Sequence, residues 1–222
     1  MDEAINNATM AELLLKQLRE PQPVLTPEEE AERRRKWELD RAIERQEAAV
    51  RAQEDAIRRI TPPGVSTVVL GGLEFGPAIK AVREWYGSDK RGLMIRGGVG
   101  SGKSVAAGVA VHDYVRSVNY AASWHRPNDF VSAVLHAYDE RSPKLGSGLV
   151  VVDDIGRETK ADFEEALCAF IDDVDTRFIL TTNLVRDDFR ARYDSRLIDR
   201  LNHCAIAVSL KERSRRRQDG GF

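Results

Sequence analysis

The feature that most constrains this chain is an apolar run that leads directly into a glycine-rich loop. Leu93-Met94-Ile95 has the pattern of a buried strand, and Gly97-Gly98-Val99-Gly100-Ser101-Gly102-Lys103-Ser104 follows one residue later. A strand before the loop and a helix after it are the context that a phosphate-binding P-loop requires. Glycines allow backbone N–H groups to surround a phosphate, and the positive end of the next helix points at it. The loop therefore predicts a nucleotide site on an α/β fold.

The loop also predicts individual roles. We expect Lys103 to reach the β- and γ-phosphates of ATP and Ser104 to hold Mg²⁺. The predicted ATP-binding residues in this segment are Gly97, Gly98, Val99, Gly100, Ser101, Gly102, Lys103, Ser104 and Val105.

A second apolar run, Leu149 to Val152, delivers Asp153 and Asp154 at its carboxyl end. Open α/β sheets place their ligands at that end of their strands. We expect Asp153 to join Ser104 in binding Mg²⁺, directly or through water, and Asp154 to orient and deprotonate an attacking water. Acids often follow strands for no catalytic reason, but this pair follows a P-loop.

A third run, Phe178 to Thr182, ends at Asn183. This amide could position the water or the γ-phosphate, although asparagine is also common where a strand enters a turn. Farther along, Arg196 and Arg200 lie four residues apart and therefore share one helix face. Such a pair is either merely solvated or reaches a neighbouring subunit's γ-phosphate as an arginine finger.

From Leu73 onward, helical and strand patterns alternate. Strands are expected at residues 92–96, 119–124, 148–152, 177–181 and 205–210, with helices between them such as 104–118 and 163–174. Alternation of this kind implies a parallel sheet covered by helices on both faces. The predicted fold class is α/β, a P-loop core with a five-stranded parallel sheet.

The first 60 residues differ in composition from the rest of the chain. They contain no glycine, and Thr61-Pro62-Pro63-Gly64 separates them from the later residues. We expect a helical segment over residues 1–60 and an ATPase domain over residues 61–222. A first helix is indicated by apolar residues on one face, namely Met10, Leu13, Leu14 and Leu18.

A second helix is predicted from Thr26 to Ile60, with Thr26 as N-cap and Glu29 completing a capping box. Ile43, Val50 and Ile57 recur every seven residues along it, as a narrow apolar seam on a charged helix. The seam could pack against the first helix as a hairpin. It could equally receive a partner's helix, because two helices of this size bury little between them.

Composition sets outer limits. Hydrophobic residues make up 42% of the chain and charged residues 32%, as in globular proteins. Neither a membrane span nor a secretory signal is visible, so a cytoplasmic protein is expected. The net charge of −2 argues against coating nucleic acid by bulk charge. Cys168 and Cys204 lie among apolar neighbours and are expected to be buried thiols.

Taken in order, these blocks resemble the AAA+ ATPases of the replicative helicase loader group, the DnaC-like proteins of bacteria and phages, which are related to transposition helper ATPases. The resemblance covers about residues 61–217. Its most specific pieces are Val-Asp-Asp-Ile-Gly at 152–156, Thr-Thr-Asn-Leu at 181–184 and Ser-Arg-Leu-Ile-Asp-Arg-Leu at 195–201.

The resemblance implies further roles. Asn183 takes the sensor-1 position, Arg200 is preferred over Arg196 as the finger that acts on a neighbour, and Arg216 is a candidate sensor of its own nucleotide. Many AAA+ proteins have Asp-Glu where this chain has Asp153 and Asp154, so Mg²⁺-dependent ATP hydrolysis is expected to be slow. The absence of a helical lid domain after Arg216 implies that a neighbouring subunit encloses part of the nucleotide.

The resemblance also implies partners. In loaders, the N-terminal region binds a hexameric DnaB-type helicase, and the ATPase domains assemble as a spiral on single-stranded DNA. The seam, with the face of the first helix, becomes the candidate helicase-binding surface. Basic residues are expected to track phosphates without reading bases, with Lys90, Arg91, Arg126 and Lys144 as candidates. The location would be the bacterial cytoplasm, or the host cytoplasm for a phage protein.

Three alternatives remain open from the sequence. A transposition helper ATPase would have the same core but deliver a transposase. A self-contained P-loop phosphotransferase would pass phosphate to a metabolite, although no acceptor pocket or arginine-rich lid is evident. A nucleotide-gated adaptor would bind ATP and scarcely hydrolyse it, so that its output is assembly.

Overall fold

The computed structural model describes residues 26–72, 76–117, 121–139, 148–159, 162–172 and 176–210. The first expected helix, Lys144 and Arg216 lie outside these residues. The chain divides into two compact units, Met1–Ala49 and Val50–Phe222. No helix in the described ranges combines the length and the apolar character needed to cross a membrane.

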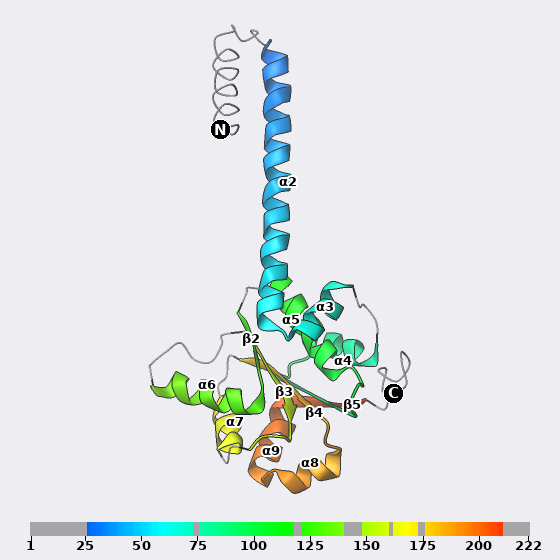
Figure 1. Ribbon diagram of the computed structural model, residues 1–222, viewed down its shortest axis with the longest axis vertical. Coiled ribbons are helices and arrows are strands. Elements are labelled where there is room, and N and C mark those ends of the chain that lie inside the picture. The colour runs from blue at the N-terminus through cyan, green and yellow to red at the C-terminus, as the bar shows by residue number, and fades with distance from the viewer. Residues whose placement is uncertain are drawn as a thin grey trace, which may run out of the picture. The chain divides into compact units, whose positions relative to one another are not determined.

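The described elements alternate as the sequence predicts (Figure 1). The helices are α2 Pro27–Ile60, α3 Pro63–Leu70, α4 Pro77–Tyr86, α5 Lys103–Ser117, α6 Pro127–Asp139, α7 Phe163–Ile171, α8 Arg186–Arg192 and α9 Ser195–Cys204. The strands are β1 Gly92–Gly97, β2 Ala122–His125, β3 Leu149–Ile155, β4 Arg177–Thr182 and β5 Ala205–Leu210. Each expected strand is present, with its ends shifted by a few residues at most.

The strands form one sheet in the order β2-β3-β4-β1-β5, and every neighbouring pair is parallel. Successive side chains of a strand point to opposite faces, which divides the core in two. Met94, Val150 and Leu180 pack in a cluster with residues of α6, α7 and α9. Leu93 and Ile95 pack on the other face with residues of α4 and α5. The predicted fold class, a five-stranded parallel sheet with helices on both faces, is confirmed.

Helix α2 begins with the predicted capping box. The backbone N–H of Thr26 donates to Oε2 of Glu29 at 2.8 Å, and the N–H of Glu29 donates to Oγ1 of Thr26 at 3.3 Å. The helix is charged along much of its length, and the guanidinium of Arg41 lies 4.9 Å from the ring centroid of Trp37. Together these features explain why a helix of this length can remain exposed to solvent.

The seam of Ile43, Val50 and Ile57 predicted from the sequence is not exposed along its whole length. Ile43 and Val50 are exposed, at 47% and 36% of their surface, but Ile57 is fully buried. Ile57 packs in the same core cluster as Trp85 and Leu93. Its seven-residue spacing therefore reflects packing within the α/β unit and not a partner surface.

Because Ile57 is buried and Ile43 is exposed, replacing each with alanine should lower the free energy of unfolding by different amounts. Ile57→Ala should lower the free energy of unfolding by about 2–4 kcal/mol, because it leaves a cavity in a packed core. Ile43→Ala, in the same helix, should change it by less than about 0.5 kcal/mol. Urea denaturation followed by tryptophan fluorescence, to which buried Trp85 contributes, measures both. Equal losses for the two variants would contradict this account of the seam.

Candidate active site

The glycine-rich loop joins the end of β1 to the start of α5. Gly100 and Gly102 have positive φ angles of 79° and 91°, a conformation that only glycine adopts without strain. A Cβ atom on Gly97 would lie 2.7 Å from Oγ of Ser101 and 3.1 Å from Cβ of Leu210. Glycine is therefore required at three positions of the loop, twice for conformation and once for space.

Lys103 is the first residue of α5, and its ammonium group is held inside the loop. Its Nζ donates to the carbonyl oxygens of Gly97 at 2.8 Å and Gly98 at 2.9 Å, and to Oδ1 of Asn183 at 2.8 Å. Burial lowers the pKa of Lys103, and the carboxylates of Asp154 and Asp153 offset only part of that effect. These acceptors, and Oγ of Ser101 at 3.5 Å, are all neutral, so the charge of Lys103 remains available to an anion.

Asp153 is where β3, β4 and α5 meet. Its carboxylate is almost completely buried. Oδ1 accepts hydrogen bonds from Oγ1 of Thr181 at 2.6 Å and from Oγ of Ser104 at 2.9 Å. A carboxylate and a hydroxyl side by side are the hard oxygen ligands that Mg²⁺ prefers. The predicted pair of Ser104 and Asp153 therefore fits a magnesium ion.

Asp154 lines the same hollow as Asp153 because the backbone changes direction between the two acids. Its φ is 68°, the one positive value among the described non-glycine residues. The pairing of β3 with β4 shifts its register between Val152 and Ile155, as in a β-bulge. The backbone N–H of Asp154 donates to Oγ1 of Thr181 at 2.8 Å. One threonine hydroxyl thus fixes the carboxylate of Asp153 and the backbone of Asp154.

Asn183 follows β4 and bridges the lysine and the second acid. Its Oδ1 accepts from Nζ of Lys103, and its Nδ2 donates to Oδ1 of Asp154. An aspartate could make the first contact but not the second, because a carboxylate has no N–H to donate. Nε of Arg157, on an exposed side chain, lies 3.5 Å from the other oxygen of Asp154.

These residues surround one hollow at the carboxyl edge of the sheet. Its lining consists of Val99, Gly100, Lys103, Ser104, Asp153, Asp154, Arg157, Thr181 and Asn183. Val105 does not line it, because its side chain packs against the small cluster of Val65, Val69, Ile79 and Val109. Any contact of Val105 with a nucleotide would have to come from its backbone.

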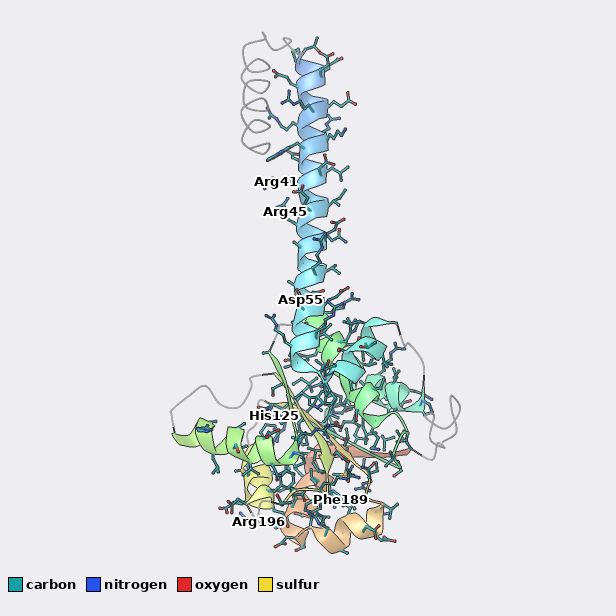
Figure 2. The ribbon with its side chains drawn as sticks, viewed as in Figure 1. Arg41, Arg45, Asp55, His125, Phe189 and Arg196 are labelled. Atoms are coloured by element: carbon teal, nitrogen blue, oxygen red, sulfur yellow. The ribbon has the colours of Figure 1, made fainter. Side chains whose placement is uncertain are left out.

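The two predicted arginine fingers do not line this hollow in their own chain. Arg196 lies on the first turn of α9 with an exposed side chain (Figure 2), and its backbone N–H donates to the N-cap carboxylate of Asp194 at 2.8 Å. Nε and Nη2 of Arg200 donate to the two carboxylate oxygens of Asp172, at 3.1 and 3.3 Å. Leu197, on the other side of α9, is buried.

Three groups at or beside the site, Thr181, Arg157 and Glu158, were not predicted from the sequence. The sequence indicates Thr181 only as part of a strand end, although the pairing of β3 with β4 brings it beside the acids. Glu158 accepts hydrogen bonds from the N–H of Gly156 at 2.7 Å, the hydroxyl of Tyr193 at 2.6 Å and Nε of Arg192 at 3.1 Å. It ties the turn after Asp154 to the end of α8, and no local pattern indicates so distant a contact.

Glu158 gives a test of this turn. Burial raises its pKa, but the hydrogen bonds from Tyr193, Gly156 and Arg192 outweigh that effect and hold the pKa below its ordinary value of 4.5. Its stabilising effect is therefore complete above about pH 4.5 and is lost as the pH falls through the lowered pKa. Glu158→Gln should lower the free energy of unfolding by about 1–3 kcal/mol at neutral pH, and this loss should become smaller at acid pH.

Urea denaturation across a pH series measures this difference between wild type and variant. Glu165→Gln, at an exposed position of α7, is the matched control and should leave stability nearly unchanged. A cost that is independent of pH would show that the charge of Glu158 does not stabilise the turn.

No protein-family model matches the sequence, and no curated protein matches it significantly. Among solved structures, it is similar to a candidate primosome component from Streptococcus pyogenes serotype M3, with a TM-score of 0.55 and 16% identity over 72% of this chain and 97% of that one. A DNA replication initiation factor has a TM-score of 0.49 and 17% identity over 64% of this chain and 48% of its own. A DnaC helicase loader has a TM-score of 0.48 and 17% identity over 63% of this chain and 92% of its own.

This chain thus spans about half the length of the initiation factor. At such low identity, the similarity to the primosome component shows the fold alone. The parallel α/β fold that the sequence predicts is thus shared with that component.

Proposed function

We propose that this chain is an ATP-hydrolysing helicase loader of DNA replication. The observation that carries the proposal is the convergence of Lys103, Asp153, Asp154 and Asn183 on one hollow beside a P-loop. A fold shared with a candidate primosome component agrees with a role in replication. The proposed division is a partner-binding segment over residues 1–60 and an ATPase domain over residues 61–222.

The first step is nucleotide binding. The loop offers its backbone N–H groups to the β-phosphate, and Lys103 exchanges its carbonyl partners for phosphate oxygens, because a charge-assisted hydrogen bond is stronger than one to a neutral acceptor. Ser104 and Asp153 would hold Mg²⁺, which neutralises charge on the β- and γ-phosphates. Burial of Asp153 between two hydroxyl donors keeps that oxygen pair in place.

The second step is hydrolysis. Asp154 accepts a proton from a water at its carboxylate, and the water oxygen bonds to the γ-phosphorus while the bond to the β–γ bridging oxygen breaks, giving ADP and phosphate. Asn183 orients Asp154 through Nδ2 while its Oδ1 contacts the ammonium of Lys103. It therefore links the group that binds phosphate to the group that activates water.

No arginine of α9, the expected finger helix, lines the nucleotide hollow of its own chain. Lys103 and Arg157 line the hollow in their own chain, and we propose that a neighbouring subunit supplies the further arginine charge that offsets the developing transition state on the γ-phosphate. Arg200 is suited to this because its partner Asp172 is 58% exposed, and an exposed ion pair is readily exchanged for a phosphate. Hydrolysis would consequently depend on assembly.

The test is ATP hydrolysis by wild type, Lys103→Ala and Arg200→Ala across protein concentration, with and without single-stranded DNA. Turnover should rise with concentration and with DNA. Lys103→Ala should lose nucleotide binding. Arg200→Ala should bind ATP normally but hydrolyse it about a thousandfold more slowly, as when an arginine finger is removed. Arg116→Ala, at an exposed position near the end of α5, is the control.

Turnover that is independent of concentration and indifferent to Arg200 would contradict the proposal and favour a self-contained P-loop enzyme. Binding without turnover under all conditions would favour a nucleotide-gated adaptor.

The proposed partner is a hexameric replicative helicase of DnaB type, and α2 supplies the candidate surface. Leu39 and Ile43 lie four residues apart, on one face of the helix, with 61% and 47% of their surfaces exposed. Exposed apolar side chains at this spacing suit an apolar groove or a second helix. Ile57, buried in the α/β core, is no longer part of the proposed surface.

A double substitution, Leu39→Ser with Ile43→Ser, should weaken helicase binding by at least about tenfold, because it removes two apolar contacts. Co-sedimentation of the full chain with the helicase measures this, and the ATPase activity without helicase should not change. Leu135→Ser, at an exposed apolar position of α6, is the control. Unchanged binding by the double variant would exclude this surface. Binding to a transposase instead of a helicase would favour a transposition helper.

A further inference from the structure

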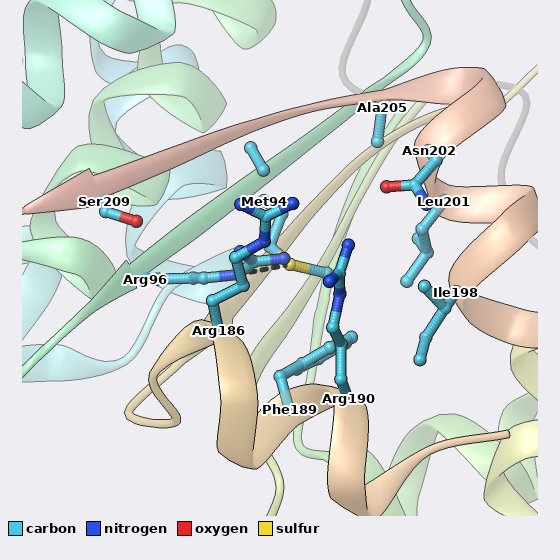
Figure 3. A pocket seen from close by; sticks show the side chains of 11 residues that line it. Met94, Arg96, Arg186, Phe189, Arg190, Ile198, Leu201, Asn202, Ala205 and Ser209 are labelled. Atoms are coloured by element: carbon cyan, nitrogen blue, oxygen red, sulfur yellow. Dashed lines mark hydrogen bonds between the residues drawn. The ribbon is translucent and has the colours of Figure 1, made fainter. Parts of the chain in front are cut away.

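A second hollow lies between β1, α8, α9 and the edge strand β5, and three arginines converge on it (Figure 3). Arg96 comes from the end of β1, and Arg186 and Arg190 lie one turn apart on α8. Side chains such as Met94 and Phe189 make the hollow partly apolar. Arg186 and Arg190 are exposed, whereas Arg96 is partly buried.

The three arginines have no acidic partner in the described part of the chain. Nε of Arg96 donates to the sulfur of Met94 at 3.2 Å, and its guanidinium lies 5.2 Å from the ring centroid of Phe189. Both contacts leave the positive charge uncompensated. Asp187 and Asp188 lie on the same helix but do not line the hollow.

The charges also act on one another. Burial lowers the pKa of Arg96, and the neighbouring charges of Arg186 and Arg190 lower it further. Like charges held together in a partly desolvated hollow destabilise the protein, and an anion that enters it relieves the repulsion. The arrangement is therefore more favourable with an anion than without one.

We propose that this hollow binds phosphate groups of single-stranded nucleic acid, an inference that rests on the proposed loader function and names where the strand would lie. A carboxylate has two oxygens, and a single arginine guanidinium can bind both of them at once. Three guanidinium groups, one from β1 and two from α8, offer more N–H donors than a carboxylate can accept. They therefore suit phosphate groups, which have more oxygens. Asn202 and Ser209 add polar groups at the exposed margin.

The surroundings of the hollow favour a nucleic-acid strand over a small anion as its ligand. β5 is the last strand of the sheet, and its residues Ala207 and Ser209 line the hollow with exposed side chains. Within the described ranges no strand pairs with the outer side of β5, so the hollow continues onto an edge along which a polymer can pass. Phe189, the aromatic residue in the lining, is 2% exposed and has no free face for a base. Binding should then follow phosphates and depend strongly on salt, without base preference.

This position differs from the candidates named from the sequence. Nζ of Lys90 donates to the carbonyl oxygen of His203 at 2.7 Å, and Nη2 of Arg91 donates to that of Ile171 at 2.6 Å. Both line a separate hollow that also contains Asp172 and Asp199. Carboxylates in that hollow would repel a phosphate backbone.

The test is fluorescence anisotropy of labelled oligothymidylate with the full chain and a non-hydrolysable ATP analogue, across a range of salt concentrations. Arg186→Gln with Arg190→Gln should weaken binding by roughly tenfold for each arginine removed. The slope of log affinity against log salt should fall by about 0.7 for each phosphate that the variant no longer binds. Arg83→Gln, at an exposed position of α4, is the control. Both hollow positions are exposed and the substitutions remove like-charge repulsion, so the melting temperature should not fall.

The other outcomes separate the possible errors. If the wild type binds no single-stranded DNA, the DNA-binding part of the proposed function fails and this inference fails with it. If the wild type binds and the double variant binds equally well, only the inference is overturned. Loss of ATP-dependent self-association with intact DNA binding would identify a protein contact and also overturn it. So would calorimetric binding of inorganic phosphate that the double variant loses while its oligothymidylate affinity is unchanged.

Discussion

The hydrogen bonds of Asp153 are the interaction on which the rest of the site depends. A buried carboxylate is costly unless donors surround it, and here the donors are the hydroxyls of Thr181 and Ser104. Those hydroxyls belong to β4 and α5, so satisfying one charge fixes three elements against one another. Because Ser104 directly follows Lys103, the same contact fixes the start of the helix behind the phosphate loop. Loss of either hydroxyl would therefore disturb geometry beyond Asp153 itself.

Asp154 depends on the same arrangement. A left-handed backbone at a non-glycine residue costs about 1–3 kcal/mol and persists only where its surroundings impose it. Thr181 holds its N–H, Asn183 holds its carboxylate, and Glu158 holds the next turn at Gly156. Consecutive side chains of a regular strand point to opposite faces of the sheet. The bulge breaks this rule and turns the side chain of Asp154 towards the hollow. Strain at this point thus has a specific effect, which is to let two consecutive residues serve one site.

Local patterns explain what could be predicted from the sequence. The glycine loop, the apolar strands and the Thr26 capping box each depend on residues close together in the chain, and each is found where expected. The burial of Ile57 could not be predicted in this way, because a seven-residue repeat looks the same whether its last member faces solvent or a core. Thr181 and Glu158 act through contacts between distant segments. Arg96 and Arg190 line one hollow only in the folded chain, where Phe189 of α8 contacts Arg96 of β1.

β1 connects the two hollows through consecutive residues. Arg96 faces the three-arginine hollow, and the carbonyl oxygen of the next residue, Gly97, accepts a hydrogen bond from Lys103. β1 lies inside the sheet, paired with β4 on one side and β5 on the other, which restricts independent movement of either residue. A phosphate bound by Lys103 would release the carbonyl oxygen of Gly97, which directly follows Arg96 in the same strand. In a nucleotide-driven loader, that proximity would offer a direct physical route by which the bound nucleotide changes the affinity of the arginine hollow for a nucleic-acid strand.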